Sequence, residues 1–170
     1  MRLWDTGTRN TYRELKGHDG PGRAVAFSRC GRLVASGDDG RASVILVHEV
    51  RTGALVSSWR GHGGSDVREL AFTPSGLLVA AFHVGGWRGV DDPARSKLKF
   101  WSIALNQPCG EHGLGCHSIS AMAISPDGSL IAAGGNGVDV EVLQAARPPR
   151  AAGTEGVRRS ATGRRGFEET

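Results

Sequence analysis

The sequence has few cysteines, few aromatic residues and no long apolar run. Three cysteines in 170 residues, an odd number at uneven spacing, argue against a disulfide scaffold. No segment approaches the ~18 consecutive apolar residues of a membrane-spanning helix, so we expect no membrane contact. Because residues 1–5 have the pattern of a strand rather than of a secretory signal, we expect a reducing, cytoplasmic location.

The motifs of common catalytic sites are also missing. The chain has no Gly-rich phosphate loop, no nucleophile elbow and no His-Glu-x-x-His motif. The adjacent carboxylates Asp38-Asp39 and Asp91-Asp92 lie in turn sequences, and turn chemistry accounts for them. We therefore expect a protein that is not an enzyme and has no cofactor.

One short segment contains four residues of metal-ligating type, Cys109, His112, Cys116 and His117. Thiolate and imidazole are zinc ligands, and four of them could complete a tetrahedral site. The spacing matches no common zinc knuckle, however, and adjacent side chains point apart in an extended segment. Zinc binding stays open as the weaker interpretation, and we expect no metal.

Positive charge is concentrated at the end of the chain. Residues 147–170 contain six Arg and three Glu, which supplies +3 of the net charge of +4. They have no apolar period and are typical of disorder. The body, residues 1–146, has 15 basic and 14 acidic residues, so the high isoelectric point does not indicate a nucleic-acid-binding fold, and no nucleic-acid partner is expected.

The dominant feature of the body is a motif that occurs three times. An apolar run, a tight turn and a second apolar run occupy residues 23–35, 68–80 and 120–132. Phe27 and Phe72 are 45 residues apart, and Phe72 and Ile124 are 52 apart, which fits four-stranded propeller blades of ~40–45 residues with an extra loop in the second. The turns Thr73–Gly76 and Ser125–Gly128 place Pro and Gly where a β-turn needs them.

The sequence thus predicts an all-β propeller segment of about three four-stranded antiparallel blades with a leading half-blade. Expected units are residues 2–18, 19–62, 63–115 and 116–146. Strands are expected near residues 2–5, 11–17, 23–28, 32–37, 43–50, 54–60, 67–73, 77–84, 97–103, 119–125, 129–134 and 138–144. The second unit has only a weak fourth strand near 105–108, and the third unit has no clear fourth strand.

Several motifs in these units resemble the WD-repeat family. They are Leu3-Trp4-Asp5, the pairs Gly17-His18 and Gly61-His62, and the Ser-Pro-Asp-Gly type of turn, and the resemblance covers roughly residues 2–145. It implies a β-propeller in which a Gly-His histidine, a second-strand Ser or Thr, a turn Asp and a third-strand Trp form a structural hydrogen-bond network.

Mapped onto this chain, the network is degenerate. The matching residues are Trp4, Asp5, His18, Ser36, Asp39 (or its neighbour Asp38), His62, Trp101 and His117. Val47 takes the Trp position in the first unit and Leu143 in the third, while Ala80 and Ala81 replace the hydroxyl residue of the second. We interpret the histidines as structural.

The number of blades is too small for a usual ring. Propellers close with about four to eight blades, and an open arc leaves two sheet edges bare. Three interpretations remain: the chain is part of a longer propeller, it closes a ring by self-association, or its leading strand completes the last blade in a minimal closed arrangement.

Residues 85–97 form an insertion between the second and third strands of the second unit, with nine more residues than the first unit has there. In propellers such loops emerge on the face that carries the blade-connecting segments. Trp and Arg anchor many protein interfaces. The candidate partner-binding residues are Trp87, Arg88, Asp91, Asp92 and Arg95.

These observations predict a non-catalytic scaffold that binds an unidentified protein partner through one loop-bearing face. Residues 97–101, Lys-Leu-Lys-Phe-Trp, also resemble blades of echinoderm microtubule-associated-protein-like and ciliary WD-repeat proteins, which would imply contact with tubulin or the axoneme. The remaining alternative is a propeller fragment without activity of its own.

Overall fold

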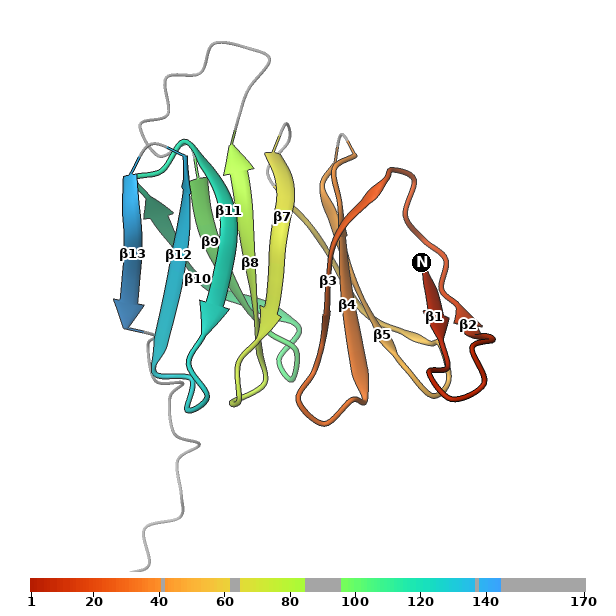
Figure 1. The fold of residues 1–170 in the computed structure, drawn as a ribbon. Helices are drawn as coiled ribbons and strands as arrows, with labels where there is room; N and C mark the ends of the chain where they lie inside the picture. Colours follow the sequence, from red (N-terminus) through yellow and green to blue (C-terminus); the bar gives the residue numbers. More distant parts are fainter. Residues whose placement is uncertain (41, 62–64, 85–95, 137, 145–170) are drawn as a thin grey trace, which may run out of the picture.

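The computed structural model describes residues 1–40, 42–61, 65–84, 96–136 and 138–144. Every regular element in these ranges is a β-strand. The described residues accordingly include no helix long and apolar enough to cross a membrane. Four antiparallel sheets stand side by side in a row (Figure 1).

We name the sheets in chain order. The leading hairpin consists of β1 (Arg2–Trp4) and β2 (Thr11–Glu14). The first sheet consists of β3 (Gly22–Phe27), β4 (Leu33–Asp38), β5 (Val44–Glu49) and β6 (Leu55–Arg60). The second consists of β7 (Ser65–Phe72), β8 (Leu77–Val84), β9 (Ser96–Ser102) and β10 (Gln107–Leu114). The third consists of β11 (Ser118–Ile124), β12 (Leu130–Asn136) and β13 (Val138–Gln144).

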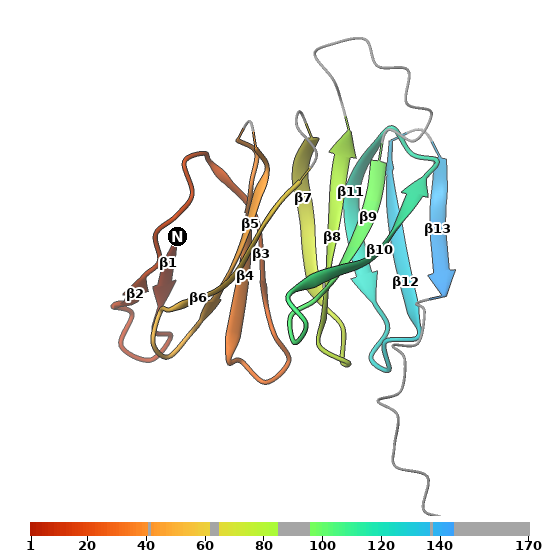
Figure 2. The same ribbon diagram turned by 180° about the vertical axis from the view of Figure 1, so that it is seen from behind.

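Each sheet is a meander in which strands pair in chain order. The first strands β3, β7 and β11 are neighbours across the sheets, and β7 contacts the other two. The fourth strands β6 and β10 lie on the opposite side of the molecule, which Figure 2 shows from behind. This is the arrangement of partial β-propeller blades, as the sequence predicts.

The turns between the first and second strands repeat one structure, with Gly31, Gly76 and Gly128 at φ of +70°, +86° and +75°. Each glycine N–H donates to the carbonyl three residues earlier, at 2.8–3.0 Å. Because L side chains rarely adopt this conformation, glycine is required there. The turn prediction is confirmed in all three units.

The fourth strand of the second unit is longer than expected and lies later in the chain. Residues 103–106 form a turn, and β10 then pairs with β9 from Gln107 to Leu114. Of its eight residues only Leu114 is buried. An outer strand with exposed side chains needs no apolar alternation, which is why its sequence did not indicate its length.

Apolar side chains fill the spaces between neighbouring sheets. Strand β8 is covered on both sides: residues 78–82 are at most 1% exposed, and alternate side chains enter two different core clusters. One cluster lies between the first and second sheets and the other between the second and third. The near-continuous apolar sequence of β8 follows from this double burial.

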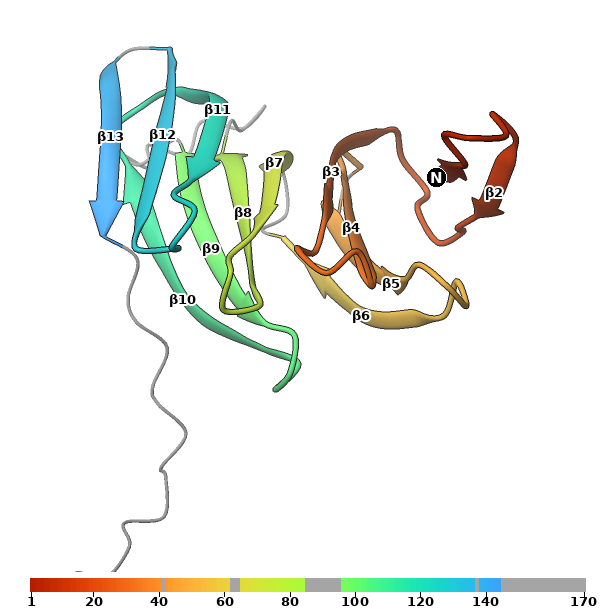
Figure 3. The same ribbon diagram turned by 60° about the horizontal axis from the view of Figure 1, so that its bottom comes forward.

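The leading hairpin packs on the first sheet and lies at the far end of the row from β13 (Figure 3). Leu3 and Leu15 are buried against Val34. The Arg13 guanidinium also donates to the Arg51 carbonyl at 2.8 Å. The hairpin forms a two-stranded sheet of its own and does not pair with β11–β13, so the interpretation in which the leading strand completes the last blade is wrong for this structure.

Candidate functional site

A buried hydrogen-bond network joins the segment before β3 to the first sheet. His18 Nδ1 lies 3.0 Å from Asp38 Oδ2, and His18 Nε2 lies 2.7 Å from Ser36 Oγ. Asp38 Oδ1 also accepts a hydrogen bond of 2.8 Å from the Val44 N–H, at the start of β5. The network fixes the loop between two sheets relative to β4 and β5.

The same three residue types, in the order Ser-His-Asp, form the nucleophilic site of many hydrolases. Here Ser36 is 4% exposed and Asp38 is 2% exposed, because both lie between sheets. A nucleophile must reach its substrate, whereas these groups mainly satisfy one another's hydrogen bonds. The geometry therefore supports a structural role for His18.

The acidic member of the network is Asp38, and the choice of Asp39 is wrong. Asp39 Oδ2 instead accepts a hydrogen bond of 2.6 Å from Arg23 Nε. Asp38 is the last residue of β4, and successive side chains of an extended chain point to opposite sides. Only one of the two carboxylates can therefore face His18.

The strand register also corrects the position that corresponds to Trp101. In the second sheet Trp101 lies opposite Leu78. In the first sheet Val34 takes the place of Leu78, and the residue opposite Val34 is His48. Val47 faces the opposite side of the sheet, where it joins the core shared with the second sheet. The first sheet thus has His48 in the place assigned to Val47.

The third sheet has Leu143 at this position, opposite Ile131, as predicted. The His117 side chain is exposed, and its backbone N–H donates to the Asn136 carbonyl at 2.9 Å. His62 lies outside the described residues.

The Trp-Asp pair of the leading hairpin lies apart from the network. Trp4 is 60% exposed. Asp5 closes the turn of the hairpin, where its Oδ1 accepts hydrogen bonds from the Thr8 N–H at 2.6 Å and the Thr8 hydroxyl at 2.9 Å. These hydrogen bonds from Thr8 lower the pKa of Asp5.

His48 is 4% exposed, and this burial is the main cause that lowers its pKa from the ordinary value of 6.5. The charges of His18 and the N-terminus lower the pKa further, whereas a hydrogen bond with the Lys16 backbone opposes the shift. At a pH between the lowered pKa of His48 in the folded chain and its ordinary pKa in the unfolded chain, the unfolded chain binds a proton at His48 more readily than the folded chain does. Stability is therefore expected to be complete above about pH 6.5 and to fall as the pH drops below it.

Urea denaturation at pH 7.5 and 5.5 measures this loss. We expect His48→Leu to remove part of the difference between the two pH values. His112→Gln, on the exposed side of β10, serves as the control and should leave the difference unchanged. An equal pH dependence in wild type and His48→Leu would contradict the assignment.

The five candidate partner-binding residues, Trp87, Arg88, Asp91, Asp92 and Arg95, all lie outside the described residues. Their insertion is attached to the end of β8 and the start of β9, which are paired through His83 and Ser96. Figure 1 places these strand ends at the same end of the second sheet as the start of β7.

Charged side chains gather at this loop-bearing end. Arg68 Nη2 lies 3.0 Å from Asp66 Oδ2 in β7, and Arg23 of β3 pairs with Asp39. The hydrogen bond and charge of Asp39, followed by the charge of Asp66, raise the pKa of Arg23. Charges of both signs from two neighbouring sheets therefore lie at the end of the sheets from which the insertion leaves β8.

Among the hollows on the described part of the surface, two lie elsewhere, and the sequence indicated neither. The larger, a groove of about 540 Å³, lies between β6 and the β9–β10 pair. Trp59 and Trp101 stack there with ring centroids 5.7 Å apart, and Lys99 lies 3.8 Å from Glu111. The only sequence signal for the groove is Trp59 at the end of an outer strand.

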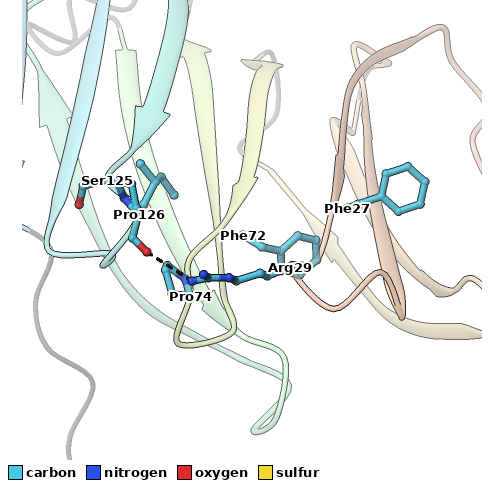
Figure 4. Close-up of a pocket in the computed structure, with 7 residues that line it drawn as sticks. Phe27, Arg29, Phe72, Pro74, Ser125 and Pro126 are labelled. Carbon is cyan, nitrogen blue, oxygen red and sulfur yellow. Dashed lines mark hydrogen bonds between the residues drawn. The ribbon is translucent and has the colours of Figure 1, made fainter.

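The smaller hollow, of about 220 Å³, lies where the turns of all three sheets approach one another (Figure 4). Phe27, Phe72 and Pro74 line it, and Arg29 extends across it to donate a 3.4 Å hydrogen bond to the Pro126 carbonyl. It is at the opposite end of the sheets from the insertion.

The four candidate zinc ligands do not form a site. Cys109, His112 and His117 are exposed, whereas Cys116 is 2% exposed within the core between the second and third sheets. In the described part of the chain, no three His, Cys, Asp or Glu side chains are grouped so that they could hold a metal.

Comparison with known proteins agrees with this geometry. The family model "WD domain, G-beta repeat" matches residues 9–45 and 109–138. These two segments are similar to WD repeats. A curated relative, the periodic tryptophan protein 2 homolog of Neurospora crassa, is 26% identical over 158 residues, which cover 80% of this chain and 16% of the relative. The chain thus spans about a sixth of that relative's length.

Both matched segments contain parts of blades seen in the structure. Residues 9–45 include β2, β3, β4 and the His18 network, and residues 109–138 include most of β10 with β11 and β12. WD repeats are typical of scaffolds for protein–protein interaction, and this general role is what the repeats indicate here.

Proposed function

We propose that this chain is a non-catalytic scaffold that binds a protein partner through the loop-bearing end of its sheets. One observation carries the proposal: the insertion connects β8 and β9, and β8 is buried on both of its faces. Val79, Ala81 and Leu98 are fully buried in these two strands. Loops on such rigid supports carry function disproportionately often.

The surroundings of the insertion suit a protein interface. The Arg23–Asp39 and Arg68–Asp66 pairs lie at the same end and provide polar contacts at a rim. Trp87 and Arg88 are of the residue types that contribute most to interface energies. The contacts proposed are with Trp87, Arg88, Asp91, Asp92 and Arg95.

Affinity purification with quantitative mass spectrometry tests the proposal. We expect Trp87→Ala combined with Arg88→Ala to reduce recovery of specific partners at least tenfold, because two anchor side chains are lost. Leu105→Ala provides the control, since Leu105 is 67% exposed in the turn at the other end of the second sheet. Equal recovery with both variants would contradict binding through the insertion.

Three other expectations remain predictions. Microtubule or axoneme contact rests on the resemblance of residues 97–101 and would appear as co-sedimentation with polymerised tubulin. A fragment without activity would yield no specific partner with the unaltered chain. The expected cytoplasmic location rests on composition, and localising the tagged full chain in cells tests it.

A further inference from the structure

The groove between the first and second sheets is built from strands in the middle of the chain. One wall is the end of β6, and the other is formed by the paired strands β9 and β10 (Figure 2). Its volume of about 540 Å³ is in the range typical of ligand pockets. Neither sheet lies at an end of the row, so the groove does not involve the outermost strands of the row.

The side of the second sheet that faces the groove is only partly covered. Trp101 of β9 is 4% exposed, because Trp59 of β6 stacks on it with ring centroids 5.7 Å apart. Pro108 of β10 lies opposite Trp101, so the two side chains share this side of the sheet, yet Pro108 is exposed. The first sheet ends at β6, and no further strand among the described residues reaches over β10. A strand added beside β6, at the usual spacing of about 4.8 Å, would cover that side of β10.

The two outer strands differ in how well they can accept an added strand. The pairing of β10 shifts register between Pro108 and Gly110, and proline has no backbone N–H to donate. The part of β6 at the groove, from Ser57 to Arg60, pairs regularly with β5 and contains neither proline nor glycine. Strand β6 therefore offers a regular free edge beside the groove, whereas β10 does not.

The charges of the groove favour an acidic occupant. Its lining contains two cations, Arg60 and Lys99, and one anion, Glu111. Lys99 Nζ lies 3.8 Å from Glu111 Oε2, but the Glu111 side chain is 54% exposed, so water screens this pair. Arg60 is exposed and forms no ion pair with any described residue. Positive charge is therefore left for a carboxylate from outside.

We propose that this groove binds an extended acidic segment of a partner protein, which adds to the first sheet as a fifth strand along β6. The main-chain groups of the segment hydrogen-bond with the free edge, and its alternate side chains give specificity. Apolar side chains pack against Trp59 and over Pro108, while carboxylates approach Arg60 and Lys99. The segment thus alternates apolar and acidic residues. The site is separate from the insertion and does not require the function proposed for it.

Fluorescence anisotropy of a labelled peptide, Glu-Val-Glu-Phe-Glu-Val, titrated with the full chain tests the inference. We expect saturable binding with a Kd below about 1 mM. The counterpart Lys-Val-Lys-Phe-Lys-Val should bind about tenfold more weakly or not at all, because it places ammonium groups beside Arg60 and Lys99.

A charge reversal on the protein locates the site. Arg60→Glu should weaken binding of the acidic peptide about tenfold, because an exposed cation at the groove becomes an anion. Arg51→Glu is the matched control: Arg51 is exposed in the turn before β6, at the other end of that strand, and its replacement should leave Kd unchanged. Circular dichroism melts of both variants verify folding.

Backbone methylation of the peptide tests strand addition separately from charge. Only every second N–H of an added strand points toward β6. Two peptides, each N-methylated at one of the two alternating sets of residues, should therefore differ, with one losing binding and the other retaining it.

Four outcomes would overturn the inference. They are the absence of saturable binding by the acidic peptide, equal binding by Arg60→Glu and Arg51→Glu, and equal binding by the two methylated peptides. The fourth is a dimer of the unaltered chain that Arg60→Glu dissociates, which would assign the groove to a second copy.

Discussion

Replacing Phe82 with alanine is expected to lower the free energy of unfolding by about 3–5 kcal/mol. Phe82 is 1% exposed and lies between the first and second sheets, with its ring centroid 5.9 Å from that of Trp101. A Cβ on Gly61 would lie only 2.7 Å from the ring, so the ring packs closely against that backbone. The cavity left by its removal could close only if the sheets shifted.

Urea denaturation followed by tryptophan fluorescence measures this effect, and the chain offers a matched control. Phe27→Ala makes the same change at a side chain that is 56% exposed, and it should cost less than about 1 kcal/mol. Comparable losses for the two variants would show that Phe82 does not hold the two sheets together.

Replacing Asp38 with alanine is expected to cost about 2–4 kcal/mol, since each buried group left without its hydrogen-bond partner costs ~1–3 kcal/mol. The change removes the acceptor of the Val44 N–H and the partner of His18 Nδ1. Because Asp38 is 2% exposed, water cannot readily replace the carboxylate. The loop before β3 should also become more open to hydrogen exchange.

The neighbouring carboxylate is the natural control for this experiment. Asp39→Ala removes one ion pair with Arg23, whose side chain is 49% exposed, and such pairs contribute ~0–1 kcal/mol. Equal destabilisation by the two changes, or a larger loss from Asp39→Ala, would contradict the assignment of Asp38 to the network.

Much of the fold could be predicted from local sequence. The turn glycines, such as Gly76 and Gly128, report a backbone conformation that few other residues adopt. The spacing of the three motifs indicates repeated blades, and strands covered on both sides, such as β8, carry near-continuous apolar sequence. The limits of β10 were missed because most of its side chains face solvent and leave no pattern.

The sites were harder to predict for a different physical reason. Asp38 and Asp39 are equivalent in sequence, and only the pleat of β4 decides which one meets His18. Likewise, the pairing of β4 with β5 assigns His48 rather than Val47 to the position of Trp101. A shift of one residue reverses the side of the sheet that a side chain faces, and sequence alone does not fix that register.

By itself the sequence determined the class of fold, the repeat and the turns, because these depend on contacts within a few residues. The tertiary structure alone decided which side chains meet across sheets. It placed the leading hairpin against the first sheet and left Trp4 at one end of the row and Val142 at the other exposed. Those outcomes depend on packing between segments far apart in the chain, where burial of apolar area rather than local preference sets the arrangement.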